Sequence, residues 1–310
     1  MSLSVAVLMD PIEAIHVEKD STFAMLLEAQ RRGHEVLYLT QAGLAVRGSV
    51  PWGHVAGVEV RDDSHDWFTL GDAQWRDLRD VDVILARKDP PFDQQFLYDT
   101  MVLELAQRAG VLVVNDPQSL RDANEKLYSL QFPQCIPPTL IAREPSELRR
   151  FAADHDEIVL KPLDGMGGQS IFRSRSGDPN LNVILETLTG EGRRFAVAQR
   201  YLPEIAGGDR RILLVDGEPV PYLLARMPQG NDFRGNLARG GKGVGMPLND
   251  RERWIAAQVG PELSRRGMLF VVAVDWCTRT RVPRWRKLRP TTSVVIGRAA
   301  GRSFSMLPSR

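Results

Sequence analysis

Apolar runs that alternate with amphipathic segments over the first 115 residues constrain the fold of this chain most. The run "LSVAVLM" at residues 3–9 is continuously apolar, which is typical of a strand buried on both faces of a parallel sheet. A helix is predicted over residues 20–34, with Asp20 or Ser21 as its N-cap and Gly33 at its end. The alternation continues with strands predicted at residues 35–39, 81–86 and 111–115 and a helix predicted at residues 93–109. The pattern predicts an α/β domain built on a parallel sheet.

The chain changes character between residues 115 and 141. Residues 115–130 begin with Asn-Asp-Pro and are predicted to be helical. Three prolines within residues 132–141 then interrupt the pattern, which indicates a domain boundary. Residues 41–76 have weak periodicity, and no element is predicted there.

The second half of the chain is predicted to contain strands, a hairpin and a helix. Two apolar runs around Asp216-Gly217 predict a β-hairpin over residues 210–227. Residues 228–245 are rich in glycine and poor in apolar side chains, so they are predicted to form a long mobile loop. The other predictions are strands at residues 157–163, 170–173, 195–202 and 268–275 and a helix at residues 249–266.

Charge is distributed unevenly along the chain. Residues 276–310 contain eight Arg, one Lys and no Asp or Glu, whereas the first 275 residues hold the other 31 basic and all 39 acidic residues. The net charge of +1 therefore averages a body of −8 and a tail of +9.

Bulk composition is that of a globular protein, with 43% hydrophobic and 25% charged residues. No apolar stretch approaches the length of a membrane span, and the N-terminus lacks the basic region of a signal peptide. Cys135 and Cys277 are the two cysteines, and they make neither a disulfide framework nor a metal-ligand cluster. This usage fits a cytoplasmic protein.

The segment "VLKPLDGMGGQSI" at residues 159–171 is the sharpest local motif. Lys161 lies at the end of a predicted strand, and a glycine-rich turn follows it. Glycines let the backbone approach a ligand and aim N–H groups at anionic oxygens, and a lysine adds a point charge for a phosphate. The order differs from a Walker A loop and from a Rossmann turn. Nucleotide binding and a plain tight hairpin beside a surface lysine both fit the motif.

Several charged residues accompany this motif. Lys126 precedes the proline-rich break, Asp209 and Arg211 flank the start of the predicted hairpin, and Arg226 ends it. Each of them, taken singly, fits an ordinary surface charge. Asp275 follows an apolar run, and a carboxylate at the end of a buried strand needs a partner, for which a metal ion is one candidate.

Seven stretches together resemble the bacterial glutathione synthetases, a family of ATP-grasp ligases. They are "MDPI", "KDSTFAMLLEAQRRGHE", "RKDPPFD", "PQSLRDANEKL", "LKPLDGMGG", "GDRRILLVDGEPVPYLLAR" and "RGNLARGG". The resemblance implies an N-terminal α/β substrate domain at residues 1–122, and two ATP-grasp subdomains at residues 123–202 and 203–275 that clamp a nucleotide between their sheets. It also implies ligation of γ-glutamylcysteine to glycine with ATP and Mg²⁺ or Mn²⁺, through an acyl phosphate, in a cytoplasmic homo-oligomer that is commonly a tetramer.

The resemblance also implies roles for individual residues. The implied nucleotide contacts are Lys126, Lys161, Leu163, Gly165, Gly167, Gly168, Gln199, Tyr201, Leu202 and Asp209. The implied catalytic residues, which would stabilise the phosphoryl group or the acyl phosphate, are Arg211, Arg226 and Arg234. Asp275 is the implied metal ligand. Arg87, Asp20 and Ser21 are implied to lie near the peptide substrate.

The resemblance stops after Asp275. In the family a Glu-x-Asn pair follows about eight and ten residues later and holds Mg²⁺, whereas here those positions are Pro283 and Trp285. Residues 276–310 contain no Asp, Glu or Asn. Arginines cannot supply the oxygen ligands that Mg²⁺ requires, so the sequence lacks this part of the expected metal site.

Three interpretations of the tail at residues 276–310 compete. They are a basic nucleic-acid arm, a degenerate paralogue that binds nucleotide without turnover, and a change of reading frame near residues 271–280, in the gene or in its sequencing. An arm is disfavoured, because the ligase sheet needs this segment as a strand. The abrupt loss of pattern favours the changed frame, and no nucleic-acid or membrane partner is predicted. The alternative functions are an ATP-grasp ligase of another dipeptide or carboxylate–amine pair and a catalytically impaired nucleotide-binding form.

Overall fold

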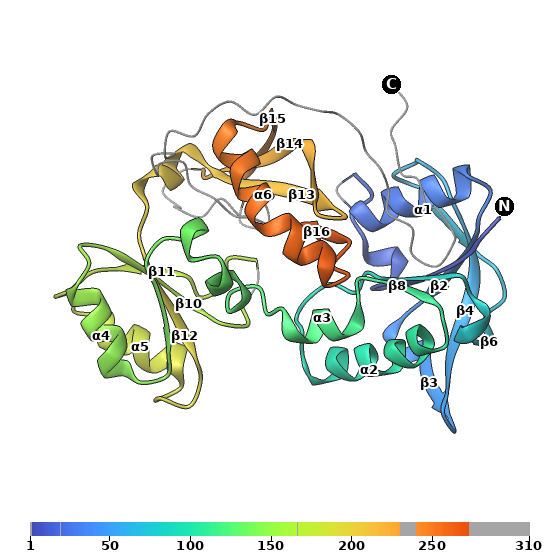
Figure 1. The fold of residues 1–310 in the computed structure, drawn as a ribbon, viewed down its shortest axis with the longest axis horizontal. Coiled ribbons are helices and arrows are strands. Elements are labelled where there is room, and N and C mark those ends of the chain that lie inside the picture. The colour runs from blue at the N-terminus through green and yellow to red at the C-terminus, as the bar shows by residue number, and fades with distance from the viewer. Residues whose placement is uncertain (1, 19, 166, 230–239, 273–310) are drawn as a thin grey trace.

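Three β-sheets follow one another along the chain in the computed structural model, which describes residues 2–18, 20–165, 167–229 and 240–272 (Figure 1). The first sheet contains β1 (Ser4–Leu8), β2 (Glu35–Leu39), β3 (Leu44–Arg47), β4 (Val50–Val60), β5 (Phe68–Leu70), β6 (Gln74–Asp77), β7 (Val83–Ala86) and β8 (Leu112–Val114). The second has the order β11 (Phe172–Ser174), β10 (Ile158–Pro162), β12 (Ala196–Arg200), β9 (Thr139–Ala142). The third has the order β15 (Lys242–Pro247), β14 (Glu218–Met227), β13 (Asp209–Val215), β16 (Phe270–Val272).

The helices are placed between and beside these strands (Figure 1). The α-helices are α1 (Ser21–Arg31), α2 (Gln94–Arg108), α3 (Pro117–Asp122), α4 (Pro145–Ala153), α5 (Leu181–Thr189) and α6 (Asp250–Arg265). Short 3₁₀ helices occur at Ile12–Ala14, Gln41–Gly43, Leu78–Asp80, Tyr128–Gln131, Pro133–Cys135 and Pro203–Gly207. No helix of the described residues is long and apolar enough to cross a membrane.

The parallel centre of the first sheet confirms the α/β prediction. Strand β1 pairs in parallel with β2 and β7, and β7 pairs in parallel with β8. Alternate residues of β1 enter two different cores, because successive side chains of a strand point to opposite faces. Val5 and Val7 pack with Phe23 of α1, whereas Leu8 packs with Leu103 of α2. The continuous apolar run therefore reflects burial on both faces, and Asp20 caps α1 as predicted by accepting from the N–H of Phe23 at 2.8 Å.

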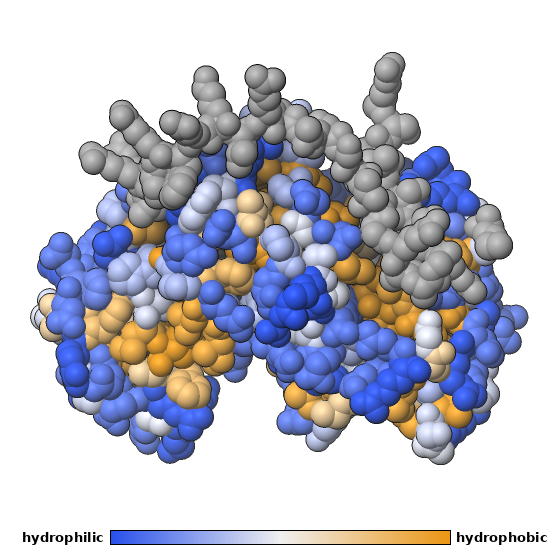
Figure 2. Space-filling model, viewed as in Figure 1, coloured by the Kyte–Doolittle hydropathy of each residue, from blue (hydrophilic) through white to orange (hydrophobic). Residues whose placement is uncertain are grey.

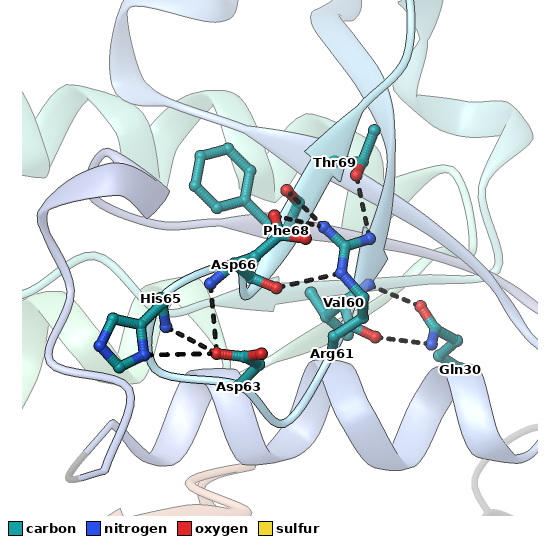
Figure 3. Close-up of polar contacts among 8 residues, drawn as sticks. All are labelled: Gln30, Val60, Arg61, Asp63, His65, Asp66, Phe68 and Thr69. Atoms are coloured by element: carbon teal, nitrogen blue, oxygen red, sulfur yellow. Dashed lines mark hydrogen bonds and ion pairs between the residues drawn. The ribbon is translucent and has the colours of Figure 1, made fainter.

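Residues 41–76, where the sequence predicts no element, add four strands to this sheet. Strand β4 is antiparallel to β2, β3, β5 and β6. The turn between β4 and β5 is organised by Arg61, which donates to Asp66 at 2.8 Å and to Thr69 at 3.0 Å (Figure 3). Gln30 of α1 exchanges two 2.8 Å hydrogen bonds with the backbone of Val60 (Figure 3). These contacts fix the end of β4 against the helix.

The second and third sheets each bury one face against helices. The core of the second sheet joins Ile158 and Leu160 to Leu148 of α4 and Leu185 of α5. The third sheet packs against α6 through a separate core (Figure 1). In the space-filling view, a notch at the lower edge lies between the lobe that carries the second sheet and the part that carries α2, and the two are continuous above it (Figures 1 and 2).

The segment before the second sheet differs from the prediction. A helix is predicted over residues 115–130, but α3 ends at Asp122. The side chain of Asn124 accepts hydrogen bonds from the N–H groups of Lys126 and Leu127, each at 3.0 Å. An Asn side chain that binds nearby backbone N–H groups competes with helix formation. Lys126 therefore lies on a turn rather than on a helix.

The core of the third sheet also includes residues from before the second sheet. Tyr128, Phe132 and Cys135 are buried in the same cluster as Ile212 and Ile255. The predicted division at residues 122 and 202 remains a prediction. These three residues bear on it because they pack with the third sheet although they lie in the segment predicted as the first subdomain.

The predicted hairpin over residues 210–227 is present as β13 and β14, and its turn meets α6 at very short range. A Cβ atom built on Gly260 would lie 1.9 Å from the carbonyl oxygen of Gly217, which has φ of +78°. Ser264, one helical turn further on, donates to the carboxylate of Asp216 at 2.6 Å. The helix and the turn are thus in backbone contact.

The prediction of a loop over residues 228–245 is wrong at its end. Residues 242–245 belong to strand β15 and pair with β14.

The third sheet is joined to the first through Asn115. Its side chain donates to the carbonyl oxygen of Phe270 and accepts from the N–H of Phe270, both at 2.8 Å. The N–H of Asp116 donates to Gly267 at 3.1 Å, and Ser119 donates to the carbonyl of Arg266 at 2.6 Å. The first residues of β16 are therefore fixed against the end of β8.

Candidate functional site

The glycine-rich turn between β10 and β11 is held by Lys126. Its Nζ donates to the carbonyl oxygen of Leu163 at 3.1 Å and to that of Gly165 at 2.9 Å. Gly167 and Gly168 have φ of +61° and +77°, a region that favours glycine. Lys126 is far from the glycine-rich motif in the sequence but contacts it in the structure, where its ammonium orients two carbonyl groups of the turn.

Lys161, on β10, lies on the face of the second sheet that also carries Gln199. The ammonium of Lys161 donates to Oε1 of Gln199 at 2.7 Å. Nε2 of Gln199 donates to the hydroxyl of Thr139 at 2.9 Å, and that hydroxyl donates to the carbonyl of Pro137 at 2.8 Å. No local sequence signal points to Thr139, because its contact with Gln199 arises from the pairing of β9 with β12.

The end of β12 carries the residues implied for the adenine side. The N–H of Tyr201 donates to the carbonyl of Glu157 at 2.9 Å. The guanidinium of Arg173 lies 4.0 Å from the ring centre of Tyr201 and also donates to the carboxylate of Glu157 at 2.7 Å. Leu202 follows and accepts from the N–H of Ile205. The Tyr201 ring is therefore fixed by a cation–π contact.

Asp209 and Arg226 face one another across β13 and β14, where they are directly paired. The Nε of Arg226 donates to one carboxylate oxygen at 2.7 Å and Nη2 donates to the other at 2.5 Å. Both residues are buried, with 7% and 4% of their surface exposed. Arg211 lies two residues after Asp209 on β13, so its side chain leaves the same face of the strand. This face is the one opposite Ile212 and α6.

A second polar cluster lies where β1 and β7 end, which is the edge of a parallel sheet that commonly binds ligands. Arg87, directly after β7, donates to the hydroxyl of Ser21 at 2.8 Å and to that of Thr22 at 3.0 Å. Burial lowers the pKa of the Arg87 guanidinium, and the carboxylates of Asp20 and Asp89 oppose that shift. The Arg87 guanidinium also lies 4.9 Å from the ring centre of Phe270 on β16.

Two predicted residues cannot be placed. Arg234, implied as catalytic, and Asp275, implied as the metal ligand, lie outside the described residues. Within the described part of the chain, no group of three or more His, Cys, Asp or Glu side chains is arranged to hold a metal ion. Because residues 276–310 add no Asp, Glu or Asn, the residues present do not fit the family's magnesium site.

Comparison with known proteins decides the family. Residues 3–121 match the model described as "Prokaryotic glutathione synthetase, N-terminal domain", and residues 125–277 match "Prokaryotic glutathione synthetase, ATP-grasp domain". The chain belongs to the prokaryotic glutathione synthetase family. It is 59% identical over 285 residues to the glutathione synthetase of Xanthomonas axonopodis pv. citri (strain 306), covering 91% of this chain and 90% of that protein. The glutathione synthetase of Pseudomonas aeruginosa is 55% identical with the same shares covered.

Solved structures support the ATP-grasp fold of this glutathione synthetase family member. D-cycloserine synthetase DcsG matches with a TM-score of 0.57 and 15% identity, covering 86% of this chain and 83% of that one. D-alanyl-alanine synthetase A from Vibrio cholerae matches with a TM-score of 0.52 and 13% identity, covering 87% and 82%. At these identities the likeness concerns the fold alone. Family membership makes the chain an ATP-dependent ligase.

Proposed function

We propose that the chain is a glutathione synthetase, which joins γ-glutamylcysteine to glycine at the expense of ATP. The observation that carries the proposal is the 59% identity to the Xanthomonas glutathione synthetase over 91% of the chain. The relatives are named for this activity, and the similarity extends through both halves of the clamp. The proposed place of action is the cytoplasm, with small molecules rather than nucleic acid or membrane as partners.

The chemistry requires a carboxylate to become an electrophile. A carboxylate oxygen of the dipeptide attacks the γ-phosphorus of ATP, the bond to ADP breaks, and an acyl phosphate forms. The amine of glycine then attacks the carbonyl carbon, and phosphate leaves. Positive charge around the transferred oxygens stabilises the first step, and exclusion of water protects the acyl phosphate.

The proposed nucleotide contacts lie on the second and third sheets and on turns beside the second sheet. Lys126 and Lys161 contact phosphates in this proposal, and the glycine turn at residues 165–168 supplies backbone N–H groups. Support comes from the 2.9 Å contact of the Lys126 ammonium with Gly165, which places a cation directly at the turn. Residues 199–202 receive the adenine, and Leu163 lines the same side.

Asp209 is proposed on the ribose side, and Arg211 and Arg226 near the phosphoryl group. The carboxylate of Asp209 accepts from Nε of Arg226 with one oxygen and from Nη2 with the other, which fixes the orientation of the guanidinium. Arg234 has the same proposed role and lies outside the described residues. Arg87, Asp20 and Ser21 are proposed at the dipeptide end, where the contact between Arg87 and Ser21 holds the guanidinium.

A second candidate function is favoured by the missing metal donors. If residues 276–310 are translated as given, the chain binds nucleotide and ligates slowly, because the oxygen ligands expected after Asp275 are absent.

A direct assay tests the proposal. Purified protein is incubated with ATP, Mg²⁺, γ-glutamylcysteine and glycine, and ADP and glutathione are measured together. Formation of both products, dependent on both substrates, supports the proposal. ADP release with a different acid or amine, and none with this pair, contradicts the substrate assignment. Light scattering tests the accompanying prediction of a homotetramer.

A further inference from the structure

A chain of hydrogen bonds crosses three neighbouring strands of the second sheet. Lys161 of β10, Gln199 of β12 and Thr139 of β9 lie on one face, because Gln199 is paired directly with Val159 and with Thr139, and Lys161 is two residues from Val159. The distances along the chain are 2.7 Å, 2.9 Å and, from Thr139 to the carbonyl of Pro137, 2.8 Å.

In each of these hydrogen bonds, the choice of donor and acceptor is tied to the choice in the next bond. An ammonium has three donors and no acceptor, so the atom of Gln199 that faces Lys161 must be the amide oxygen. The amide nitrogen then points to the other side, where it needs an acceptor. Thr139 supplies that acceptor with its hydroxyl oxygen, and its own proton goes to the carbonyl oxygen of Pro137. The last group in the chain thus holds the amide of Gln199 in one of its two orientations.

We propose that Thr139 is a positioning residue for nucleotide binding, which acts through Gln199 to hold the ammonium of Lys161 toward the phosphates. The inference rests on the proposed function, because it assumes that Lys161 contacts ATP. Thr139 itself touches neither Lys161 nor, in this proposal, the nucleotide. Its hydroxyl accepts from the NH₂ group of Gln199 and so stabilises the orientation in which the amide oxygen faces the lysine.

Substitution of Thr139 by Val tests this role with little change in side-chain shape. Valine lacks the acceptor, so the NH₂ group of Gln199 loses its partner and the amide is free to turn. In the turned state an NH₂ group faces the ammonium, and the lysine is displaced from its position. Serine keeps the hydroxyl, so Thr139→Ser is expected to preserve the series of hydrogen bonds from Lys161 to Pro137.

The measurement is the affinity for ATP, determined by calorimetry on the full chain without dipeptide or glycine. Thr139→Val is expected to weaken binding by about fivefold to tenfold, the effect of one well-placed hydrogen bond. Thr139→Ser is expected to remain within about twofold of the unmodified protein on the same grounds. Thr187→Val is the matched control. The hydroxyl of Thr187 on α5 also donates to a backbone carbonyl, but Thr187 is not part of the hydrogen bonds that join Lys161, Gln199 and Thr139. Thr139→Ala replaces the valine variant if that protein is not recovered folded.

A double-mutant cycle with Lys161→Met separates positioning from general destabilisation. If Thr139 acts through the ammonium, Thr139→Val has no further effect on ATP affinity once Lys161 is Met. An equal loss in both backgrounds overturns the inference, as does an unchanged affinity of Thr139→Val in the otherwise unmodified protein. Binding of ATP with no effect of Thr139→Val contradicts the inference alone, whereas absence of ATP binding by the unmodified protein contradicts the proposed function as well.

Discussion

The second and third sheets, each of four strands, hold their cationic side chains in different ways. In the second sheet the ammonium of Lys161 is half-buried and donates to a neutral amide. In the third sheet the guanidinium of Arg226 is buried and donates twice to the carboxylate of Asp209. Removal of one partner of a buried ion pair leaves an uncompensated buried charge, which costs more than the loss of a hydrogen bond from a half-buried cation to an amide. We therefore expect the third sheet to lose more stability without Asp209 than the second sheet loses without the ammonium of Lys161.

The second and third sheets also differ in how they are joined to the other parts of the molecule. The third sheet is bound to the first through Asn115, and Phe270 reaches the guanidinium of Arg87. The second sheet lies in a lobe of its own beside α4 and α5 (Figures 1 and 2). Substitutions near β16 are therefore expected to affect the proposed dipeptide site at Arg87 as well as the proposed nucleotide site.

The largest expected effect concerns the segment that follows the third sheet. Replacement of residues 276–310 by the corresponding segment of the Xanthomonas relative is expected to raise the rate of glutathione formation by at least about a hundredfold. Loss of groups that only support a metal ligand commonly costs 10- to 100-fold, and here donors themselves are missing. The rate is measured as ADP release coupled to glutathione formation, with the mass of each protein verified.

The affinity for ATP serves as the control for this exchange, because the contacts proposed for Lys126 and Lys161 are unchanged. Equal rates for the two proteins would show that the tail as given supports turnover. The genomic DNA around codons 265–285, translated in all three frames, independently tests whether a Glu-x-Asn pair lies in a neighbouring frame.

The next effect tests the contrast between the two sheets directly. Asp209→Ala leaves the buried guanidinium of Arg226 without its carboxylate and is expected to lower the free energy of unfolding by about 3–5 kcal/mol. Lys161→Met is expected to change it by less than about 1 kcal/mol, because the side chain is half-buried and its hydrogen bond to Gln199 joins it to an uncharged group. Urea unfolding measures both, and Glu218→Ala, at an exposed position of β14, is the control. A similar loss for both variants would remove the distinction between the sheets.

A smaller effect is expected at the junction of the first and third sheets. Asn115→Ala removes both hydrogen bonds to the backbone of Phe270 and is expected to cost about 1–3 kcal/mol, since two backbone groups lose their partners. Hydrogen exchange should report faster exchange at the amide of Phe270. Gln118→Ala on the exposed side of α3 is the control. Unchanged protection of that amide would mean that Asn115 does not hold β16.

The smallest effect concerns acid stability at the end of α6. Hydrogen bonds from Arg265 and Arg266 lower the pKa of Glu262 from 4.5 to about 2. A lowered pKa in the folded state means that the stabilisation is present above 4.5 and is lost as the pH falls from 4.5 through about 2. Glu262→Gln should therefore lower Tm slightly near neutral pH and have no effect well below pH 2, where the carboxyl of Glu262 is uncharged. An equal change in Tm at both pH values would contradict this assignment.

Elements with local start and stop signals could be predicted from the sequence. Helix α6 begins after Asn249, whose side chain and that of Glu252 form a capping box, and its bounds match the predicted helix closely. Strand β4 could not be predicted, because Pro51, Gly53 and Gly57 obscure its alternation and its four partners come from elsewhere in the chain. Its existence depends on tertiary pairing rather than on local preference.

The residues of the candidate site also include some that the sequence could predict and others that it could not. Lys161 and the glycine turn are visible in one short segment, because a strand, a cation and several glycines are adjacent. Thr139 could not be found, since 60 residues separate it from Gln199 and only strand pairing brings them together. The placement of Lys126 was wrong in detail, because Asn124 turned a predicted helix into a capped turn.

The backbone contact between Gly260 and Gly217 has a consequence for protein engineering. Glycine inside a helix is usually less favourable than alanine by about 1 kcal/mol, so a stabilisation campaign would select Gly260→Ala first. Here the added methyl group would have to occupy space within 1.9 Å of a carbonyl oxygen. The substitution that general helix statistics recommend most strongly is thus the one that would push α6 away from its hairpin.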